Sequence, residues 1–146
     1  MSSNWRRISA LQALVAGSPI PQPVRAQVNQ EFAEVYNTRR IRKVPRRLLL
    51  EVLHSTRALD TALASYIVEA GGPQPVSLGA ALYHLVSPGI HSNRLSPQSR
   101  QHYQAAIVDS RNDYMHQAGK FPSAPSEISA LLTEMHSCLT DALSLW

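Results

Sequence analysis

Residues suited to phosphodiester chemistry fall close together in one stretch of the sequence, from Arg111 to His116. Arg111 carries a fixed positive charge on a planar group that can donate to two phosphate oxygens at once. Asn112 can orient a hydroxyl or a neighbouring side chain, and His116 can exchange a proton near neutral pH. Arg, Asn and His also fall this close by chance on many surface helices, so the stretch alone is a weak signal. Together, these residue types predict a site that acts on a phosphodiester.

The spacing of these residues decides how they can meet on a helix. Asn112 and His116 are four positions apart, so they stack on one face. Arg111 points about 140° away from His116, and only its long side chain lets the guanidinium reach back toward the imidazole. One helix of this kind is therefore a poor pocket by itself.

A polar stripe along the same segment offers supporting groups. It consists of His102, Asp109, Asp113 and His116, which recur at helical spacings. Asp113 could orient His116 or raise its pKa, because a nearby carboxylate favours the charged imidazole; a solvent-exposed acid is an equally good interpretation. Tyr114 and Met115 are interpreted as packing residues.

Positive charge is concentrated in the first part of the chain. The formal net charge is +4, and ten of the 14 Lys and Arg residues lie within residues 1–60, against four acids. The densest cluster consists of Arg39, Arg40, Arg42, Lys43, Arg46 and Arg47. Such a cluster attracts polyanions and predicts RNA as a partner, although a solvated basic connector is an equally good interpretation. The cluster contains no aromatic residue that could stack on bases, which argues against recognition of a particular RNA sequence there.

The sequence predicts neither a metal site nor a cofactor. Its histidines stand at positions 54, 84, 91, 102, 116 and 136. They form no His-Glu-x-x-His pattern, and no Cys-x-x-Cys pair accompanies them. There is also no Gly-rich phosphate loop, no Gly-x-Ser-x-Gly elbow and no paired catalytic carboxylate motif. Metal catalysis, the common nucleotide hydrolases, acyl transfer and glycoside hydrolysis therefore lack support.

Length and cysteine content predict one cytoplasmic domain. A chain of 146 residues can bury roughly 70% of its unfolded surface and needs no disulfide. Its only cysteine, Cys138, lies on an apolar stripe and is interpreted as a small buried thiol, which suits a reducing compartment. No run approaches the ~18 apolar residues of a membrane helix, so no membrane association is expected.

Apolar residues recur at spacings of three and four along most of the chain, which predicts an all-α fold. Pro45 suits a helical first turn, and the hydroxyls of Ser77 and Ser96 can cap helices. Ser123 or Ser126 is expected to start the last helix. The predicted helices span residues 5–15, 24–40, 45–70, 77–86 and 96–118 and the C-terminal segment. We expect an up-down four-helix bundle with one or two short accessory helices, divided into an N-terminal extension (1–20) and a single helical domain (21–146).

The motif resembles the R-x(4–6)-H signature of HEPN domains, in which an Arg, a polar residue and a His lie on a late helix of a small helical domain. Residues 53–63 resemble the long second helix of such domains, and residues 119–122 end the motif helix as in many relatives. The resemblance covers roughly residues 25–146. Only the Arg-Asn-x-x-x-His core is specific.

The resemblance implies a function and a site. Many HEPN proteins are metal-independent ribonucleases and toxins that act as dimers, so it implies a toxin or defence effector that cleaves RNA by attack of the ribose 2′-hydroxyl at a composite dimer site. Arg111, Asn112 and His116 would be the catalytic residues. His54 and Arg57, on the helix that packs against the motif helix in this family, could support them. No cofactor is expected.

Two alternatives remain open at the level of the sequence. The chain could be a non-catalytic HEPN-like module that dimerises or binds a partner and retains the motif as an interface network. It could also be a toxin that a separate antitoxin, or another protein of a defence system, neutralises.

Overall fold

The computed structural model of the chain describes residues 3–87, 93–117 and 119–145. Within these ranges all regular secondary structure is helical, which confirms the all-α prediction. The helices are α1 (Ser3–Ala16), α2 (Gln22–Asn37), η1 (Thr38–Arg40), α3 (Val44–Glu69), α4 (Leu78–Val86), α5 (Pro97–Tyr103), η2 (Gln104–Asp109), α6 (Ser110–His116) and α7 (Pro125–Leu143). η1 is a short 3₁₀ helix, whereas η2 is a π-helical segment that joins α5 to α6.

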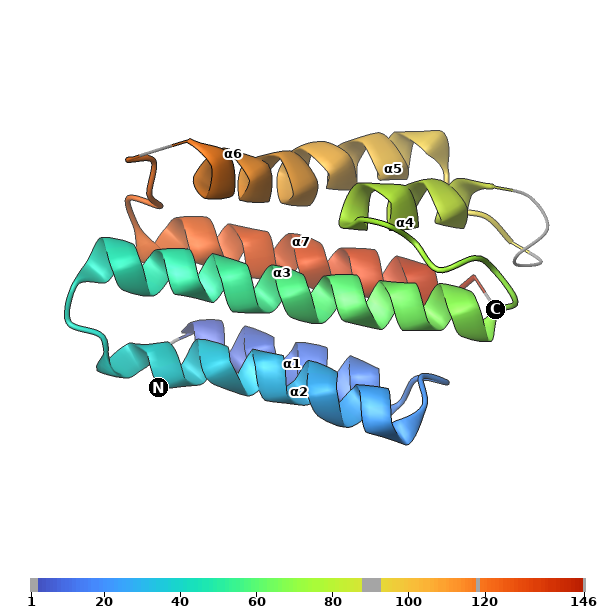
Figure 1. Cartoon of the computed structure of the whole chain (residues 1–146), viewed down its shortest axis with the longest axis horizontal. Coiled ribbons are helices and arrows are strands. Elements are labelled where there is room, and N and C mark those ends of the chain that lie inside the picture. Colours follow the sequence, from blue (N-terminus) through green and yellow to red (C-terminus); the bar gives the residue numbers. More distant parts are fainter. Residues whose placement is uncertain (1–2, 88–92, 118, 146) are drawn as a thin grey trace.

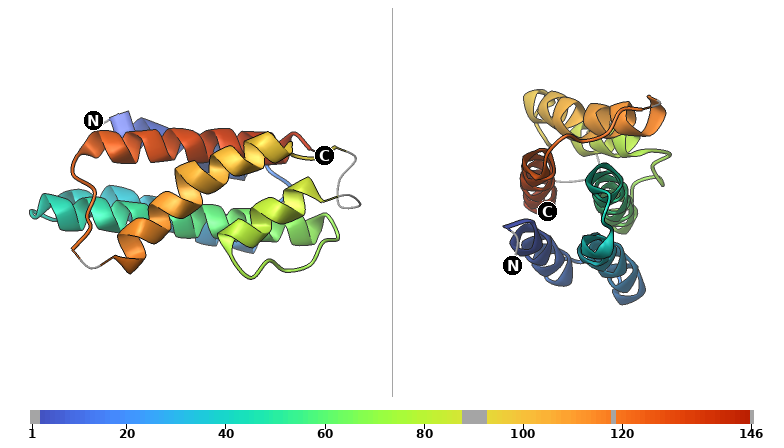
Figure 2. Two further views of the ribbon diagram at one scale, coloured as in Figure 1. Left: turned by 90° about the horizontal axis from the view of Figure 1, so that it is seen from above. Right: turned by 90° about the vertical axis from the view of Figure 1, so that its left-hand side faces the viewer.

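The helices lie in three layers (Figures 1 and 2). α1 and α2 form one outer layer, and α3 and α7 form the middle layer. α4 and the continuous rod of α5, η2 and α6 form the other outer layer. α3 contacts α2 and α4, while α7 contacts α1 and η2, so the middle layer joins the other two. The left-hand end in Figure 1 holds η1, the first turn of α3 and the last turn of α6, and we call it the motif end.

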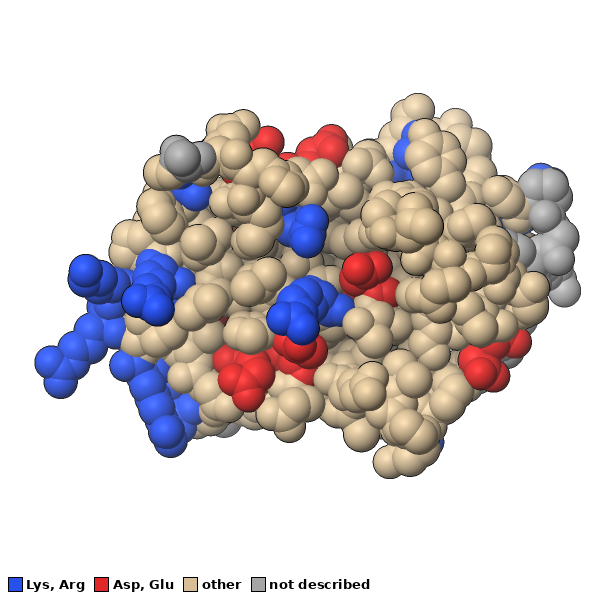
Figure 3. Space-filling model, in the orientation of Figure 1, with Lys and Arg blue, Asp and Glu red and all other residues tan. Residues whose placement is uncertain are grey.

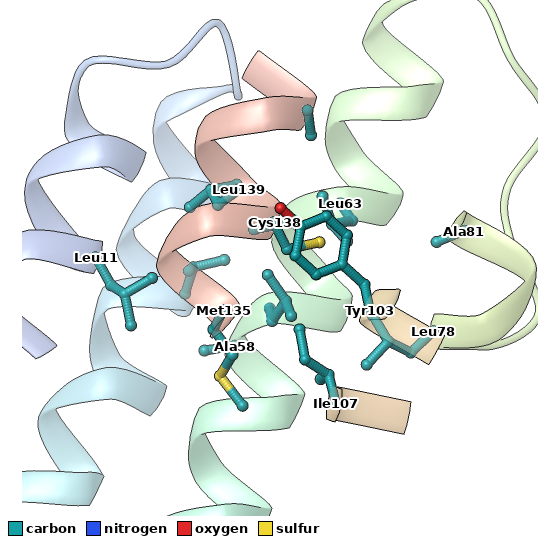
Figure 4. Close-up of a cluster of buried hydrophobic side chains, with 14 of the residues drawn as sticks. Leu11, Ala58, Leu63, Leu78, Ala81, Tyr103, Ile107, Met135, Cys138 and Leu139 are labelled. Atoms are coloured by element: carbon teal, nitrogen blue, oxygen red, sulfur yellow. The ribbon is translucent and has the colours of Figure 1, made fainter. Parts of the chain in front are cut away.

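The core lies on both sides of the middle layer. Figure 4 shows side chains from α1, α3, α7 and the η2 region converging, among them Leu11, Leu63, Ile107 and Leu139. These four are at most 1% exposed. Truncation of a buried leucine such as Leu63 to alanine typically costs about 2–5 kcal/mol, because it removes apolar contacts and leaves a cavity. The apolar stripes of the individual helices therefore hold the three layers together.

Several helix ends follow the sequence prediction. Ser77 Oγ accepts a hydrogen bond from the N–H of Ala80 over 3.1 Å, and Ser96 Oγ accepts one from the N–H of Ser99 over 3.0 Å. Pro45 lies in the first turn of α3, where its missing N–H leaves no bond unmade. These predicted caps are confirmed.

The start of α7 differs from the prediction. Ala124, and neither Ser123 nor Ser126, precedes the first turn. The carboxylate of Glu127 accepts hydrogen bonds from the backbone N–H groups of Ala124 and Ser123, and these bonds lower the pKa of Glu127. An acid three residues into a helix can satisfy these N–H groups itself, so no capping hydroxyl is needed.

The motif rod is also not the uniform α-helix that was predicted. The π-helical segment η2 interrupts it, and the α-helical part ends at His116; Ala118, where the helix was expected to end, lies outside the described residues. A π-helical turn is wider than an α-helical turn and shifts the faces that follow it. His102, which precedes this segment on α5, lies 2.6 Å from Glu134 of α7.

Helix α1 is packed into the fold. Its Ile8, Leu11 and Val15 are at most 1% exposed and belong to the same core cluster as residues of α3 and α7. The N-terminal extension predicted for residues 1–20 thus contains a helix that shares the core of the remaining chain. In the ranges that the structure describes, no helix has the length and apolarity needed to cross a lipid bilayer.

Candidate active site

Arg111 and Asn112 lie in the first turn of α6 and are joined by a hydrogen bond. Nη1 of Arg111 donates to Oδ1 of Asn112 over 3.1 Å. Neighbouring residues of a helix point about 100° apart, so the bond forms only because the long arginine side chain folds back along the helix. Both side chains are half-buried. The structure therefore brings two of the three predicted motif residues together and restrains the guanidinium.

A carboxylate that the sequence analysis did not select acts on the same guanidinium. Burial of Asp60 on α3 raises the pKa of its carboxyl group, and the positive charge of Arg111 opposes this rise. α3 and α6 are in contact, which lets the two groups interact across the layers. The charge of Arg111 thus acts on Asp60, although the two side chains form no ion pair in the described part of the chain.

His116 is the last residue of α6 and its imidazole is exposed. Within the described part of the chain it makes no hydrogen bond. Asp113 is engaged elsewhere, because its carboxylate lies 3.5 Å from Nζ of Lys120 and accepts a hydrogen bond from Gln117 over 3.5 Å. Asp113 therefore does not orient His116 in this structure, and it has the solvent-exposed position that was its alternative interpretation.

The predicted supporting residues His54 and Arg57 lie away from the motif. Both bind the carboxylate of Glu31 on α2, through His54 Nδ1 at 2.8 Å and Arg57 Nη2 at 3.2 Å. These contacts tie α3 to α2 across the first two layers. The structure does not bring the pair to Arg111; Asp60, three residues beyond Arg57, is the residue of α3 whose charge couples to α6.

The basic cluster forms the turn from α2 into α3, which we call the basic turn. It consists of Arg39, Arg40, Arg42, Lys43, Arg46 and Arg47. Figure 3 shows Lys and Arg side chains gathered at this end of the visible face, where η1 and the start of α3 lie in Figure 1. Among the described residues, none of the six is within ion-pair distance of a carboxylate. Most of this charge is therefore free to attract a polyanion.

An aromatic ring lies against the basic turn, although the cluster itself contains none. The guanidinium of Arg39 is 3.8 Å from the ring centroid of Tyr36, and Nη1 of Arg39 donates to the carbonyl oxygen of Tyr36 over 3.2 Å. Tyr36 precedes the turn on α2, and its ring packs at a 40° tilt against Trp5 of α1, with the centroids 4.2 Å apart. The sequence interpretation missed this arrangement, because Trp5 and Tyr36 are distant in the chain.

A groove lies between α3, η2, α6 and α7. Its volume is about 310 Å³, and Ser110, Tyr114 and Glu127 are among its lining residues. None of the three motif residues lines this groove. Tyr114 and Met115 pack against the core, which confirms their interpretation as packing residues. The three motif side chains therefore form no part of this groove.

The described residues form no metal site, and no similar protein indicates a function. In the described ranges, which omit His91, no three His, Cys, Asp or Glu side chains converge so that they could hold a metal ion. Comparisons with models of protein families, with curated proteins and with solved structures gave no match. The function must therefore be argued from the residues of this chain.

One signal in the sequence could have identified Asp60. It interrupts the apolar pattern of α3 between Leu59 and Leu63, where an acid is unexpected on a largely buried helix. Its partner on a distant helix could not be deduced from spacing, because that requires knowledge of which face of α3 meets α6.

Proposed function

We propose that this chain is a metal-independent endoribonuclease that acts as a homodimer, with Arg111, Asn112 and His116 in its active site. One juxtaposition carries the proposal: the exposed imidazole of His116 and the basic turn lie at the same end of the molecule, and the hydrogen-bonded Arg111–Asn112 pair lies on the same short helix as His116. The basic turn attracts the RNA backbone. The motif provides a proton acceptor and a fixed cation for the scissile phosphate.

In the proposed reaction, the ribose 2′-oxygen attacks the adjacent phosphorus and the bond from phosphorus to the 5′-oxygen breaks. One His116 takes the proton of the 2′-hydroxyl, and the second His116 of the dimer gives a proton to the departing 5′-oxygen. Arg111 donates hydrogen bonds to the non-bridging oxygens, where negative charge develops in the transition state. The products are a 2′,3′-cyclic phosphate and a free 5′-hydroxyl.

The need for two copies follows from the geometry of α6. Arg111 is directed toward Asn112 and couples to Asp60 of α3, whereas His116 is exposed at the end of the helix. A two-fold axis beside α6 would place the two motifs opposite one another and give one cleft with both sets of side chains. The dimer also brings two basic turns to one RNA molecule.

A binding module is the second candidate, and the coupling of Arg111 to Asp60 favours it. If the carboxylate of Asp60 held Arg111 permanently, the motif would serve as a polar network at a dimer or partner interface. An active enzyme that a separate antitoxin inhibits would share the features of the first candidate. Cleavage by the isolated chain separates the enzyme from the module.

We also propose a bundle topology and a cellular location for the chain. The four long rods, namely α2, α3, the α5–η2–α6 rod and α7, alternate in direction along the chain in Figure 1, which supports an up-down four-helix bundle with α1 and α4 as accessory helices. The free thiol of Cys138 and an RNA substrate both suit a cytoplasmic location.

Expression in growing cells tests the toxin form of the proposal. The wild-type chain is expected to inhibit growth when overproduced, and His116→Ala to be harmless at the same protein level. His102→Ala is the matched control, because His102 is an exposed histidine of the same rod that pairs with α7. Light scattering should give a dimer mass for all three proteins. Equal growth with wild type and His116→Ala would count against a toxin.

A further inference from the structure

A groove runs between α1 and α7, which lie side by side in Figure 2, and we call it the α1–α7 groove. Its volume is about 490 Å³. Apart from one alanine, its lining consists of cationic, imidazole and hydroxyl side chains, in the set Arg6, Arg7, Ala10, Thr133, His136 and Ser137. No described carboxylate lines it, and neither the motif of α6 nor the basic turn contributes to it. The α1–α7 groove is therefore a separate surface that is rich in hydrogen-bond donors.

Two hydrogen bonds in series hold the guanidinium of Arg7 against α7. Nε of Arg7 donates to Oγ1 of Thr133 over 3.1 Å, and this hydroxyl donates to the carbonyl oxygen of Ser129 over 2.9 Å. Both bonds can exist at once, because the hydroxyl uses its proton toward Ser129 and a lone pair toward Arg7. In the described part of the chain, the terminal nitrogens of Arg7 have no partner. Their N–H groups form a planar fork that matches two oxygens of one phosphate.

Further donors lie beside this fork. His136 and Ser137 follow Thr133 by three and four residues, so the three side chains share one face of α7. The side chains of His136 and Ser137 make no hydrogen bond within the described ranges. Arg6 is exposed and adds a second fixed positive charge from α1. The groove thus offers two guanidinium groups, an imidazole and a hydroxyl to one ligand.

The acids of α7 are engaged on a different face of the helix. The carboxylate of Glu134 lies 2.6 Å from Nε2 of His102, and that of Asp141 accepts a hydrogen bond from the hydroxyl of Tyr103. These two partners belong to α5, in the outer layer on the other side of α7 from α1. Neither arginine of the α1–α7 groove has a carboxylate within ion-pair distance among the described residues. The positive charge of the groove is therefore uncompensated and attracts anions.

Positive side chains connect the α1–α7 groove with the basic turn. Trp5 directly precedes the two arginines of α1 and packs against Tyr36 of α2. The guanidinium of Arg39, which belongs to the basic turn, lies 3.8 Å from the centroid of the same Tyr36 ring. Cationic groups therefore continue from the basic turn across the start of α1 to α7. A strip of this kind matches the repeated phosphates of a nucleic acid strand better than it matches one small anion.

We infer that the α1–α7 groove binds a backbone phosphate of an RNA strand. Arg7 donates to two oxygens of the phosphate, Arg6 adds charge, and His136 and Ser137 donate to the remaining oxygens. The identity of the polyanion rests on the proposed function, but the inference concerns binding and includes no step of cleavage. It gives α1 a role in holding the substrate.

Fluorescence anisotropy with a labelled oligouridylate tests the inference in the His116→Ala protein, which should leave the RNA intact. Arg7→Gln removes the fork and should weaken binding about tenfold or more, since hydrogen bonds between charged groups are lost. The slope of log K against log salt should fall by about 0.7. Arg94→Gln removes one charge outside the groove and should bind as the parent does. A folded Arg7→Gln protein with undiminished affinity would overturn the inference.

Ser137→Asp tests the groove without removing the bond between Arg7 and Thr133. Ser137 is exposed, so the variant is expected to fold. Its carboxylate should repel the phosphate and occupy the free donors of Arg7, which weakens RNA binding about as much as Arg7→Gln does. Gln101→Glu adds the same charge to an exposed position of α5 and should leave binding unchanged. Equal affinities of Ser137→Asp and Gln101→Glu would contradict the location of the site.

Titration with inorganic phosphate identifies the source of the bound group. An RNA site predicts that the parent binds the oligouridylate far more tightly than inorganic phosphate. If Arg7→Gln weakens the binding of inorganic phosphate but not that of the oligouridylate, the groove is a small-anion site and the RNA assignment is wrong. If Arg7→Gln weakens RNA binding although the wild-type chain does not cleave RNA, the inference stands and the proposed ribonuclease fails.

Discussion

The guanidinium of Arg111 donates a hydrogen bond over 3.1 Å to Oδ1 of Asn112, the next residue in the chain. The bond gives the polar residue of the motif a physical role, because it restrains a long side chain that would otherwise sample many rotamers. A cation that is already restrained loses less entropy when it binds a phosphate. Asn112 is therefore a positioning residue in the proposed site.

Asn112→Ala should lower the rate of RNA cleavage by about two- to tenfold, since one hydrogen bond of this kind contributes about 0.5–1.5 kcal/mol. The cleavage positions and the helical content should not change. Asn112→Asp keeps an acceptor for Arg111 and should retain more activity than Asn112→Ala. An Asn112→Ala protein as active as wild type would remove Asn112 from the site.

Arg111→Ala should make stability more sensitive to pH through Asp60. Burial raises the pKa of Asp60 and Arg111 opposes the rise, so loss of Arg111 raises this pKa further. A carboxyl with a raised pKa stabilises the folded state when protonated, and this contribution disappears as pH rises through the folded pKa. Relative to wild type, Arg111→Ala should therefore lose stability in urea unfolding as the pH rises from about 3.9, the ordinary pKa of an aspartate in an unfolded chain, through the raised folded pKa of Asp60.

The control for this experiment is the double variant Asp60→Asn with Arg111→Ala. It lacks the titrating carboxyl, so its stability relative to Asp60→Asn should vary little over the same pH interval. A pH-independent difference between Arg111→Ala and wild type would show that the two charges do not interact.

Neutralisation of Arg40, Arg42, Lys43 and Arg46 to glutamine should weaken RNA binding and flatten its salt dependence. Each lost phosphate contact reduces the slope of log K against log salt by about 0.7 for single strands. The cleavage positions should stay the same. Arg94→Gln is the single-charge control, since Arg94 is exposed and precedes α5, away from the basic turn. An unchanged salt slope would exclude the basic turn from the RNA site.

Cys138 should resist thiol reagents in the folded protein. It is 1% exposed, and burial raises the pKa of its thiol to about 12. The thiolate that reacts is therefore scarce at pH 8, and reagents cannot reach it. Labelling with an aromatic disulfide reagent should be slow under native conditions and rapid in urea. Rapid native labelling would mean that α7 opens locally.

The local signals of the chain were sufficient for most helix positions. Proline in a first turn and the hydroxyls of Ser77 and Ser96 act on residues one to three positions away, so they can be recognised without knowledge of the fold. The π-helical segment η2 was not predicted, because its residues form an acceptable α-helical pattern. The start of α7 was missed because Glu127 replaces the expected hydroxyl as the capping group.

Less of the candidate site than of the fold could be predicted from the sequence. The Arg111–Asn112 contact is local, and the orientation of a neighbouring side chain was one of the predicted alternatives for Asn112; the coupling of Arg111 to Asp60 instead joins two layers of the fold. His54 and Arg57 were expected near the motif, but the faces of α3 direct them to Glu31. Which face of a long helix meets which neighbour depends on packing of the entire core.

The most direct test of the proposed function is incubation of purified protein with total RNA and tRNA in excess EDTA, followed by mapping of the fragment ends. Wild type and His102→Ala should yield 2′,3′-cyclic phosphate and 5′-hydroxyl ends. His116→Ala should cleave about 10²–10⁴-fold more slowly, as expected for loss of a general acid–base group. Intact RNA with folded, dimeric wild type, or equal cleavage by wild type and His116→Ala, would contradict a metal-independent ribonuclease that uses His116.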